Sequence, residues 1–99
     1  MQTTTVQMIA EVRAVPQHAD DLARLFTEFA EHTRNEPGCE RFEVYRQTEE
    51  PNVFVAVMSF SDEQALQAHL EDEWRQRIVT QAADWLEGRP RRFTMQRFA

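Results

Sequence analysis

A chain of 99 residues with 41% hydrophobic and 28% charged residues, two glycines and four prolines has the composition of one folded domain, which excludes a disordered or fibrous protein. The net charge of −6 argues against a nucleic-acid partner, because phosphate backbones are bound by clustered positive charge. All eleven basic residues are arginines, which excludes Schiff-base chemistry and a lysine general base.

Cysteine content and hydropathy indicate a cytoplasmic protein. Cys39 is the single cysteine and has no partner for an internal disulfide. The N-terminal "MQTTTVQMIAEVR" has neither a basic nor a continuous apolar region, and nowhere do about 18 apolar residues run together. We therefore expect no targeting peptide and no membrane association.

The N-terminal third predicts a strand followed by a helix. Residues alternate from Thr4 to Val15, with one apolar face formed by Val6, Met8, Ala10, Val12 and Ala14. Pro16 ends this strand and suits the entry to a helix from Ala19 to Asn35. That helix has an apolar stripe of Leu22, Leu25, Phe26 and Phe29.

The middle of the chain predicts a hairpin. In "NEPGC", Pro37 prevents the helix from continuing and Gly38 supplies a turn conformation. The segments "ERFEVYRQT" and "NVFVAVMSF" are two strands, joined by the turn "EEPN".

The C-terminal part predicts a helix in two pieces and a last strand. Ser61 is the expected N-cap of the first piece, whose inner side carries Ala65, Leu66, His69 and Leu70. The second piece is expected from Trp74 to Leu86, with Gly88 as its C-cap. "RRFTMQRF" is the last strand.

This order, βαββαβ, predicts an α+β ferredoxin-like fold for residues 1–99 as a single domain. Its four strands would form one antiparallel sheet, with the helices covering one face.

The strand "NVFVAVMSF" is apolar on both faces, although the open face of such a sheet should be polar. Phe54, Ala56, Met58 and Phe60 form one row, and Val53, Val55 and Val57 form the other. We therefore predict a homodimer whose sheets pack face to face, with Glu11, Arg13, Arg41 and Glu43 needing partners near the interface. The alternative is that the last strand or a loop folds over this face.

The segment "EPGCERFEVYRQTEEPNVFVAVMSFSDEQALQAHL" resembles the antibiotic biosynthesis monooxygenase (ABM) family, most specifically in the "PGC" turn before "FEVYR" and in the passage "FSDEQALQAH". The resemblance implies a dimeric α+β barrel with a pocket in each subunit between helices and sheet. It also implies a monooxygenase that oxidises a small electron-rich aromatic, a quinol or anthrone, with dioxygen and without a metal or flavin cofactor.

The chain departs from two patterns within this family. The haem-degrading branch has an asparagine where this chain has Val12, a tryptophan where it has Phe60, and a ligating histidine later than His69, so haem is set aside. Met58 and Phe60 also replace a Glu and a Trp that are frequent in quinol-type members. This second departure favours an alternative function, a non-catalytic dimeric domain that binds a small ligand or stabilises an assembly.

His69 is the expected catalytic residue, because an imidazole in an apolar pocket is a base that works near neutral pH. The alternative is that His69 only spaces the helix through one hydrogen bond. The expected substrate-binding residues are Met8, Val12, Phe42, Met58, Phe60 and Trp74, with Tyr45 and Arg46 flanking the pocket.

Two further clusters have less specific interpretations. Glu28, His32 and Glu36 have a metal-like spacing, but we expect an exposed ion-pair ladder and no metal site. "RPRRF" contains Arg89, Arg91 and Arg92, which are either a solvated entry to the last strand or an anion site.

Overall fold

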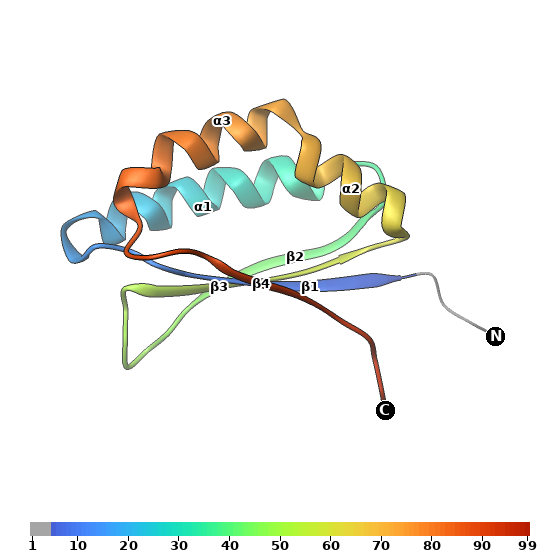
Figure 1. The fold of residues 1–99 in the computed structure, drawn as a ribbon, viewed down its shortest axis with the longest axis horizontal. Coiled ribbons are helices and arrows are strands. Elements are labelled where there is room, and N and C mark those ends of the chain that lie inside the picture. The colour runs from blue at the N-terminus through green and yellow to red at the C-terminus, as the bar shows by residue number, and fades with distance from the viewer. Residues whose placement is uncertain (1–4) are drawn as a thin grey trace.

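The computed structural model describes residues 5–99 and confirms the ferredoxin-like α+β fold (Figure 1). In chain order the elements are β1 (Val6–Arg13), α1 (Ala19–Arg34), β2 (Cys39–Arg46), β3 (Val53–Phe60), α2 (Glu63–Glu71), α3 (Glu73–Ala82) and β4 (Arg91–Met95). Two short 3-10 helices, η1 (Pro16–His18) and η2 (Ala83–Trp85), flank α1 and α3. Thr4, where the first strand was expected to begin, lies outside the described residues.

The sheet is antiparallel throughout, in the order β2-β3-β1-β4, and all helices lie on one side of it (Figure 1). β1 and β3 pair without a register shift from Val6 opposite Phe60 to Arg13 opposite Val53. Because side chains alternate along a strand, this register sends Met8 and Met58 together toward the helices. The buried core lies between that face of the sheet and the helices.

The turn from β3 into α2 corrects the expected cap. Asp62, not Ser61, is the N-cap, and its carboxylate accepts a hydrogen bond of 2.8 Å from the backbone N–H of Ala65. Ser61 is still held to the preceding turn, because its backbone N–H donates to the carbonyl of Gly38 at 2.8 Å. An aspartate at an N-cap also interacts favourably with the helix dipole.

The second helical piece is shorter than expected. α3 ends at Ala82 and is followed by η2, after which Leu86 is extended and forms a bridge with Ala14. Gly88 has φ +76° but follows this bridge, so it serves the turn into β4 and is not the cap of an α-helix. Pairing with the sheet therefore takes Leu86 out of the helix.

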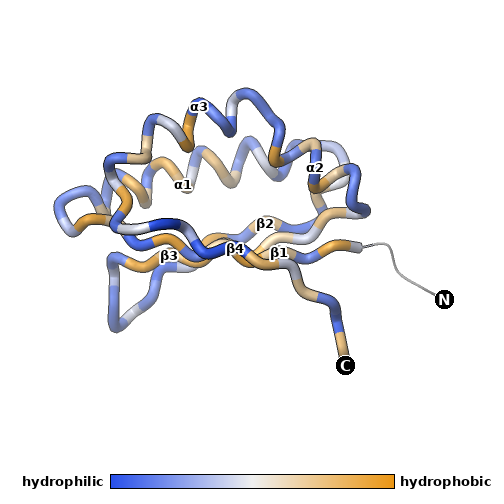
Figure 2. The backbone as a smooth tube through the Cα atoms, viewed as in Figure 1, coloured by the Kyte–Doolittle hydropathy of each residue, from blue (hydrophilic) through white to orange (hydrophobic). Residues whose placement is uncertain are grey.

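Most apolar side chains on the open face of the sheet stay accessible within one chain, but Val53, expected in the same row as Val55 and Val57, is 2% exposed and needs no partner to cover it. Val55 and Val57 are half-buried, whereas Tyr45 and Phe93 are 52% and 46% exposed. β4 pairs with the edge of β1. The last strand therefore does not fold back over the open face. Hydrophobic positions recur along the strands as well as on the helices that cover them (Figure 2).

The four charged residues expected at that face are paired inside the chain. Arg41 donates to Glu43, which also accepts from the hydroxyl of Tyr45 at 3.2 Å. Glu11 lies 3.7 Å from Arg91. Arg13 lies 3.4 Å from Glu50. A partner subunit is therefore not needed to neutralise these charges. Only the apolar residues of the open face favour a partner subunit.

Among residues 5–99, no helix has both the length and the apolar content that crossing a bilayer requires.

Gly38 supports a prediction about stability, because it has φ +83° and lies against α2. An added Cβ would lie 2.6 Å from the Cβ of Ala65 and 2.8 Å from the hydroxyl of Ser61. We expect Gly38→Ala to lower the free energy of unfolding by about 2 kcal/mol or more, from backbone strain together with this overlap.

The matched control is Gly88→Ala, which has a similar φ but no atom within 4 Å of the added Cβ. It should cost about 1 kcal/mol from the backbone alone. Urea unfolding of both variants measures the difference, and equal losses would contradict the packing role of Gly38.

Candidate functional site

A cavity of about 400 Å³ lies between the sheet and the helices, within the range of sites for small organic ligands. α1 and α3 form its roof, and the helix-facing side of the sheet forms its floor. The floor consists of Met8, Ala10, Val12, Phe42, Ala56 and Met58. The roof includes Leu22, Phe26, Phe29, Ile78 and Val79. A flat apolar molecule would be surrounded mainly by hydrocarbon and aromatic side chains.

His69 is the histidine that lines the cavity, and it comes from the last turn of α2. It is 2% exposed and is surrounded by aromatic rings. The ring centroids of Phe60, Phe29 and Phe42 lie 5.1, 6.0 and 6.2 Å from that of the imidazole. This setting removes His69 from bulk water and fixes its ring.

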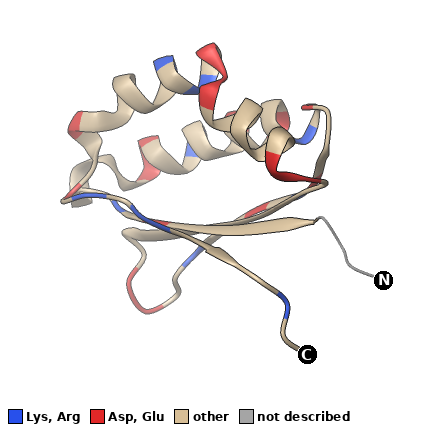
Figure 3. Ribbon diagram, turned by 45° about the vertical axis from the view of Figure 1, so that its right-hand side comes forward, with Lys and Arg blue, Asp and Glu red and all other residues tan. Residues whose placement is uncertain are grey.

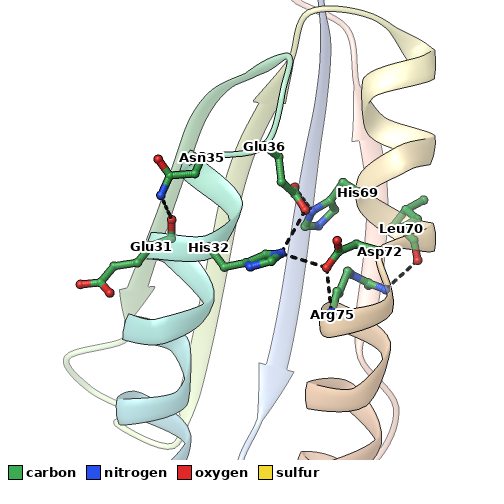
Figure 4. A network of polar contacts seen from close by, with 8 residues as sticks. All are labelled: Glu31, His32, Asn35, Glu36, His69, Leu70, Asp72 and Arg75. Atoms are coloured by element: carbon green, nitrogen blue, oxygen red, sulfur yellow. Dashed lines mark hydrogen bonds and ion pairs between the residues drawn. The ribbon is translucent and has the colours of Figure 1, made fainter.

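Glu36 is the hydrogen-bond partner of His69. Its Oε1 lies 2.8 Å from Nδ1 of the imidazole, and only 14% of its side chain is exposed (Figure 4). A carboxylate accepts, so Nδ1 carries the proton and Nε2 of the neutral ring is an acceptor. A carboxylate that fixes a histidine in this way is the arrangement that makes an imidazole a directed base.

The contact extends into a network that joins α1 to α2 and α3 (Figure 4). Nε2 of His32 lies 2.9 Å from Oδ2 of Asp72 and 3.7 Å from Oε2 of Glu36. The Asp72 carboxylate also caps α3 by accepting from the backbone N–H of Arg75 at 2.9 Å. Trp74 stacks on the imidazole of His32, with ring centroids 4.1 Å apart. The second carboxylate oxygen of Glu36 therefore lies beside the imidazole of His32.

Burial and the Glu36 carboxylate act in opposite directions on His69. Desolvation is the larger effect and lowers the pKa of His69 below its ordinary value, whereas the hydrogen bond and charge of Glu36 raise it. The positive charge of Arg75 also lowers this pKa. His69 is therefore neutral at pH 7 and able to accept a proton.

His32, Glu36 and Asp72 together offer three ligand atoms within 4.8 Å of one another, the size of a cation site. The hydrogen bonds already described account for these atoms, since His32 donates to Asp72 and Asp72 caps α3. The prediction of an exposed ion-pair ladder is wrong about exposure. His32 and Glu36 do pair, but both are half-buried parts of the network, and Glu28 on the exposed side of α1 is not part of it.

Five of the expected site residues are brought together at the cavity: Met8, Val12, Phe42, Met58 and His69. Phe60 lies behind His69, fully buried. Trp74 reaches the site through His32 and through Phe29, whose ring centroid is 5.7 Å away. Both aromatics support the site and do not line the cavity.

Tyr45 and Arg46 lie away from this cavity. The Tyr45 hydroxyl donates to Glu43 on the open side of the sheet. Arg46 donates to the carbonyl of Pro51 and to Asp20, and its guanidinium carbon lies 5.2 Å from the centroid of the Phe54 ring. The reason is strand alternation, because Tyr45 has the opposite orientation to the neighbouring Val44, and Arg46 lies at the end of β2.

Glu36 and Arg75 were not assigned a role in the site from the sequence, whereas Arg89 and Arg92 were expected either at a solvated strand entry or in an anion site. Glu36 carries the hydrogen bond to His69, while Arg75, Arg89 and Arg92 line the cavity. Glu36 directly precedes the turn at Gly38, which packs on Ala65 of α2, so the turn chemistry was a signal that α1 ends near that helix. Glu36 and His69 are 33 positions apart, so their hydrogen bond could not be predicted without the tertiary structure.

Comparisons with known proteins agree with this architecture. The sequence profile of the family described as antibiotic biosynthesis monooxygenase matches residues 5–81, so the chain belongs to the ABM family. No curated protein matches the chain.

Solved structures match over almost the whole chain. PA3566 from Pseudomonas aeruginosa is 23% identical with a TM-score of 0.90, and 100% of this chain and 99% of that one are covered. Rv0793 from Mycobacterium tuberculosis is 19% identical with a TM-score of 0.88 and 96% coverage of each chain. A crystal structure described as an antibiotic biosynthesis monooxygenase is 24% identical with a TM-score of 0.89, covering 95% of this chain and 99% of that one. At these identities the structures support the fold.

The Glu36 contact leads to a prediction about titration. We expect Glu36→Gln to lower the pKa of His69 further, because the variant removes the charge that opposes desolvation. NMR titration of the imidazole signals measures the shift. Glu28→Gln, on an exposed position of α1, is the control and should leave the pKa of His69 unchanged. A pKa that rises in Glu36→Gln would refute the assigned balance of effects.

Proposed function

We propose that this ABM-family protein is a cofactor-independent monooxygenase that oxidises a small electron-rich aromatic, of the quinol or anthrone type, with dioxygen. The observation that carries the proposal is the Glu36–His69 pair at the end of an apolar cavity. His69 is the proposed catalytic base, and Glu36 is its positioning residue.

The first chemical step would be proton removal from the substrate. Nε2 of His69 accepts a proton from the phenolic O–H, or from the acidic C–H of an anthrone, and leaves an electron-rich anion. The imidazolium that forms is stabilised by the adjacent Glu36 carboxylate, as in other carboxylate–histidine pairs.

The anion would then react with dioxygen. It transfers one electron to dioxygen, and combination of the resulting radical pair forms a C–O bond to a peroxide. Cleavage of the O–O bond, with return of the proton from His69, releases water. For an anthrone the balance is CH₂ + O₂ → C=O + H₂O, so dioxygen is the only oxidant required.

The surroundings of His69 support this chemistry. Phe42, Met8 and Met58 give the cavity an apolar floor, and such a floor limits protonation of the anion by water.

The non-catalytic alternative has support of its own, because His69 is the only imidazole of the described residues that lines the cavity and no Asp or Glu does. Catalysis would therefore depend on a single base.

Oxygen uptake with a panel of hydroquinones and anthrones tests the proposal. We expect His69→Gln to lower the substrate-dependent rate by about 100- to 10,000-fold, the usual contribution of a positioned base. His18→Gln is the control, because His18 binds Asp21 and stacks on Trp85 away from the cavity. An inactive wild type across the panel would favour the ligand-binding alternative, and equal rates in His69→Gln would remove this residue from the mechanism.

The pH profile adds an independent check. Because burial depresses the pKa of His69, the acidic limb of kcat/KM should fall below about pH 6.5, the ordinary histidine value. The rate should be constant above that limb and lost as pH falls through it.

We also propose that two copies of the chain pack through the open faces of their sheets. The support is the accessible apolar row of Ile9, Val57 and Phe93, which lie opposite one another across three strands. Leaving such side chains in water forgoes about 1.5 to 3 kcal/mol each.

Size-exclusion chromatography with light scattering tests the dimer at micromolar concentration. Val57→Lys should give monomers, because a charged ammonium in place of the valine would have to lose its water at the centre of the interface. Gln81→Lys, at an exposed position on α3, is the control and should remain dimeric. A wild-type protein that elutes as a stable monomer would contradict the proposal.

A further inference from the structure

Three arginines line the cavity beside its otherwise apolar walls. Arg75 comes from the first turn of α3, Arg89 from the turn before β4, and Arg92 from β4 itself. Figure 3 marks basic positions in blue on α3 and on the segment that leads into β4. The residues that line the cavity include no aspartate or glutamate.

In the described part of the chain, the arginines of the cavity lack the ion pairs that most of the other arginines form. The protein has a net charge of −6, and five of its arginines form ion pairs with carboxylates: Arg13, Arg24, Arg41, Arg46 and Arg91. Within residues 5–99, no carboxylate lies at ion-pair distance from the three arginines of the cavity. The nearby carboxylates of Glu36 and Asp72 are used by His69 and His32.

Arg75 is the arginine of the cavity that has a buried N–H donor without a partner among residues 5–99. Its Nη1 donates to the carbonyl of Leu70 at 3.3 Å, whereas its Nε is buried without a partner. Arg75 and Arg92 both line the cavity, so two like charges face the same space. Burial, and after it the charge of Arg92, lowers the pKa of Arg75, whereas the charges of Glu36 and Asp72 raise it. A buried donor without a partner on a half-buried cation is costly, and an anion placed there would supply the missing acceptor and offset the repulsion between the arginines.

We infer that the cavity binds an aromatic molecule that carries an acid group, a carboxylate or a phosphate, with the acid on Arg75 and Arg92 and the aromatic body extending toward His69. A planar guanidinium can donate two parallel hydrogen bonds to one such anion. The inference rests on the proposed function and narrows its substrate class.

The sheet register gives the approximate length of such a ligand. Arg92 lies opposite Ala10 on β1, whereas Met8 is in register with Met58 and Phe42, and the ring centroid of Phe42 lies 6.2 Å from that of His69. Two residues of a strand span about 7 Å, close to the length of two fused rings. A bicyclic acid would thus place its distal ring near the imidazole.

Isothermal titration of the full chain with 2-naphthoate and its neutral isostere 2-naphthamide tests the inference without any redox step. We expect the acid to bind at least about tenfold more tightly than the amide, a ratio that corresponds to one charge-assisted contact. 2-Naphthyl phosphate distinguishes phosphate from carboxylate as the acid group. The preference should weaken at high salt, because it is electrostatic.

Arg75→Gln and Arg92→Gln should each reduce the preference for the acid by about tenfold or more and leave the affinity for the amide unchanged. Arg77→Gln is the control, since Arg77 is an exposed residue of α3 that does not line the cavity. Circular dichroism checks that each variant is folded, and Arg92→Gln is informative even if Arg75→Gln is not folded.

Three results would overturn the inference: equal binding of acid and amide, no binding of either, or a preference that survives both substitutions. Oxygen uptake with 1,4-dihydroxy-2-naphthoate and 1,4-dihydroxynaphthalene distinguishes failure of the acid site from failure of the proposed oxygenase function. Tight binding of 2-naphthoate without oxygen uptake supports the acid site and refutes the oxygenase. Equal turnover of both quinols supports the oxygenase and refutes the acid site.

Discussion

The hydrogen bond between Glu36 and His69 is the contact on which the site depends. It joins the residue after the last turn of α1 to the last turn of α2, two elements that the sheet topology brings to the same end of the molecule. The bond is shielded from water, so it fixes both the tautomer and the orientation of the imidazole. Gly38 makes this geometry possible, because any side chain there would collide with α2 and move Glu36 away.

The sheet has two apolar faces that serve different purposes. The face toward the helices forms the cavity floor, and its small residues Ala10 and Ala56 leave space between sheet and roof. The opposite face has bulkier residues, Val55, Val57 and Phe93, around which the charged residues are already paired within the chain. One strand, β3, contributes to both, which explains why it is apolar at odd and even positions alike.

Local patterns in the sequence were enough to predict the order of elements and the floor of the cavity. Strand alternation placed Met8, Phe42 and Met58 on one face, and helical spacing placed His69 on the inner side of α2. Partners that are distant in sequence were not predictable. Glu36 looked like part of an exposed ladder because spacing on α1 says nothing about which element packs against its end. Tyr45 was expected to flank the pocket, although strand alternation directs it to the face opposite Phe42, where its hydroxyl donates to Glu43. Leu86 shows the same limit, since tertiary pairing with Ala14 overrode its helical pattern.

The charge of Arg75 acts on the Glu36–His69 pair, which gives the carboxylate beside the base a second role. The positive charge of Arg75 lowers the pKa of His69 and so opposes the imidazolium that proton transfer must form. A bound acid group would neutralise part of that charge, and Glu36 offsets the remainder from the other side of the ring. An amide at position 36 could still orient the ring, but it could not offset the charge. The cavity would therefore be most basic when a ligand anion occupies the arginines, so ligand binding itself would prepare His69 to accept the proton.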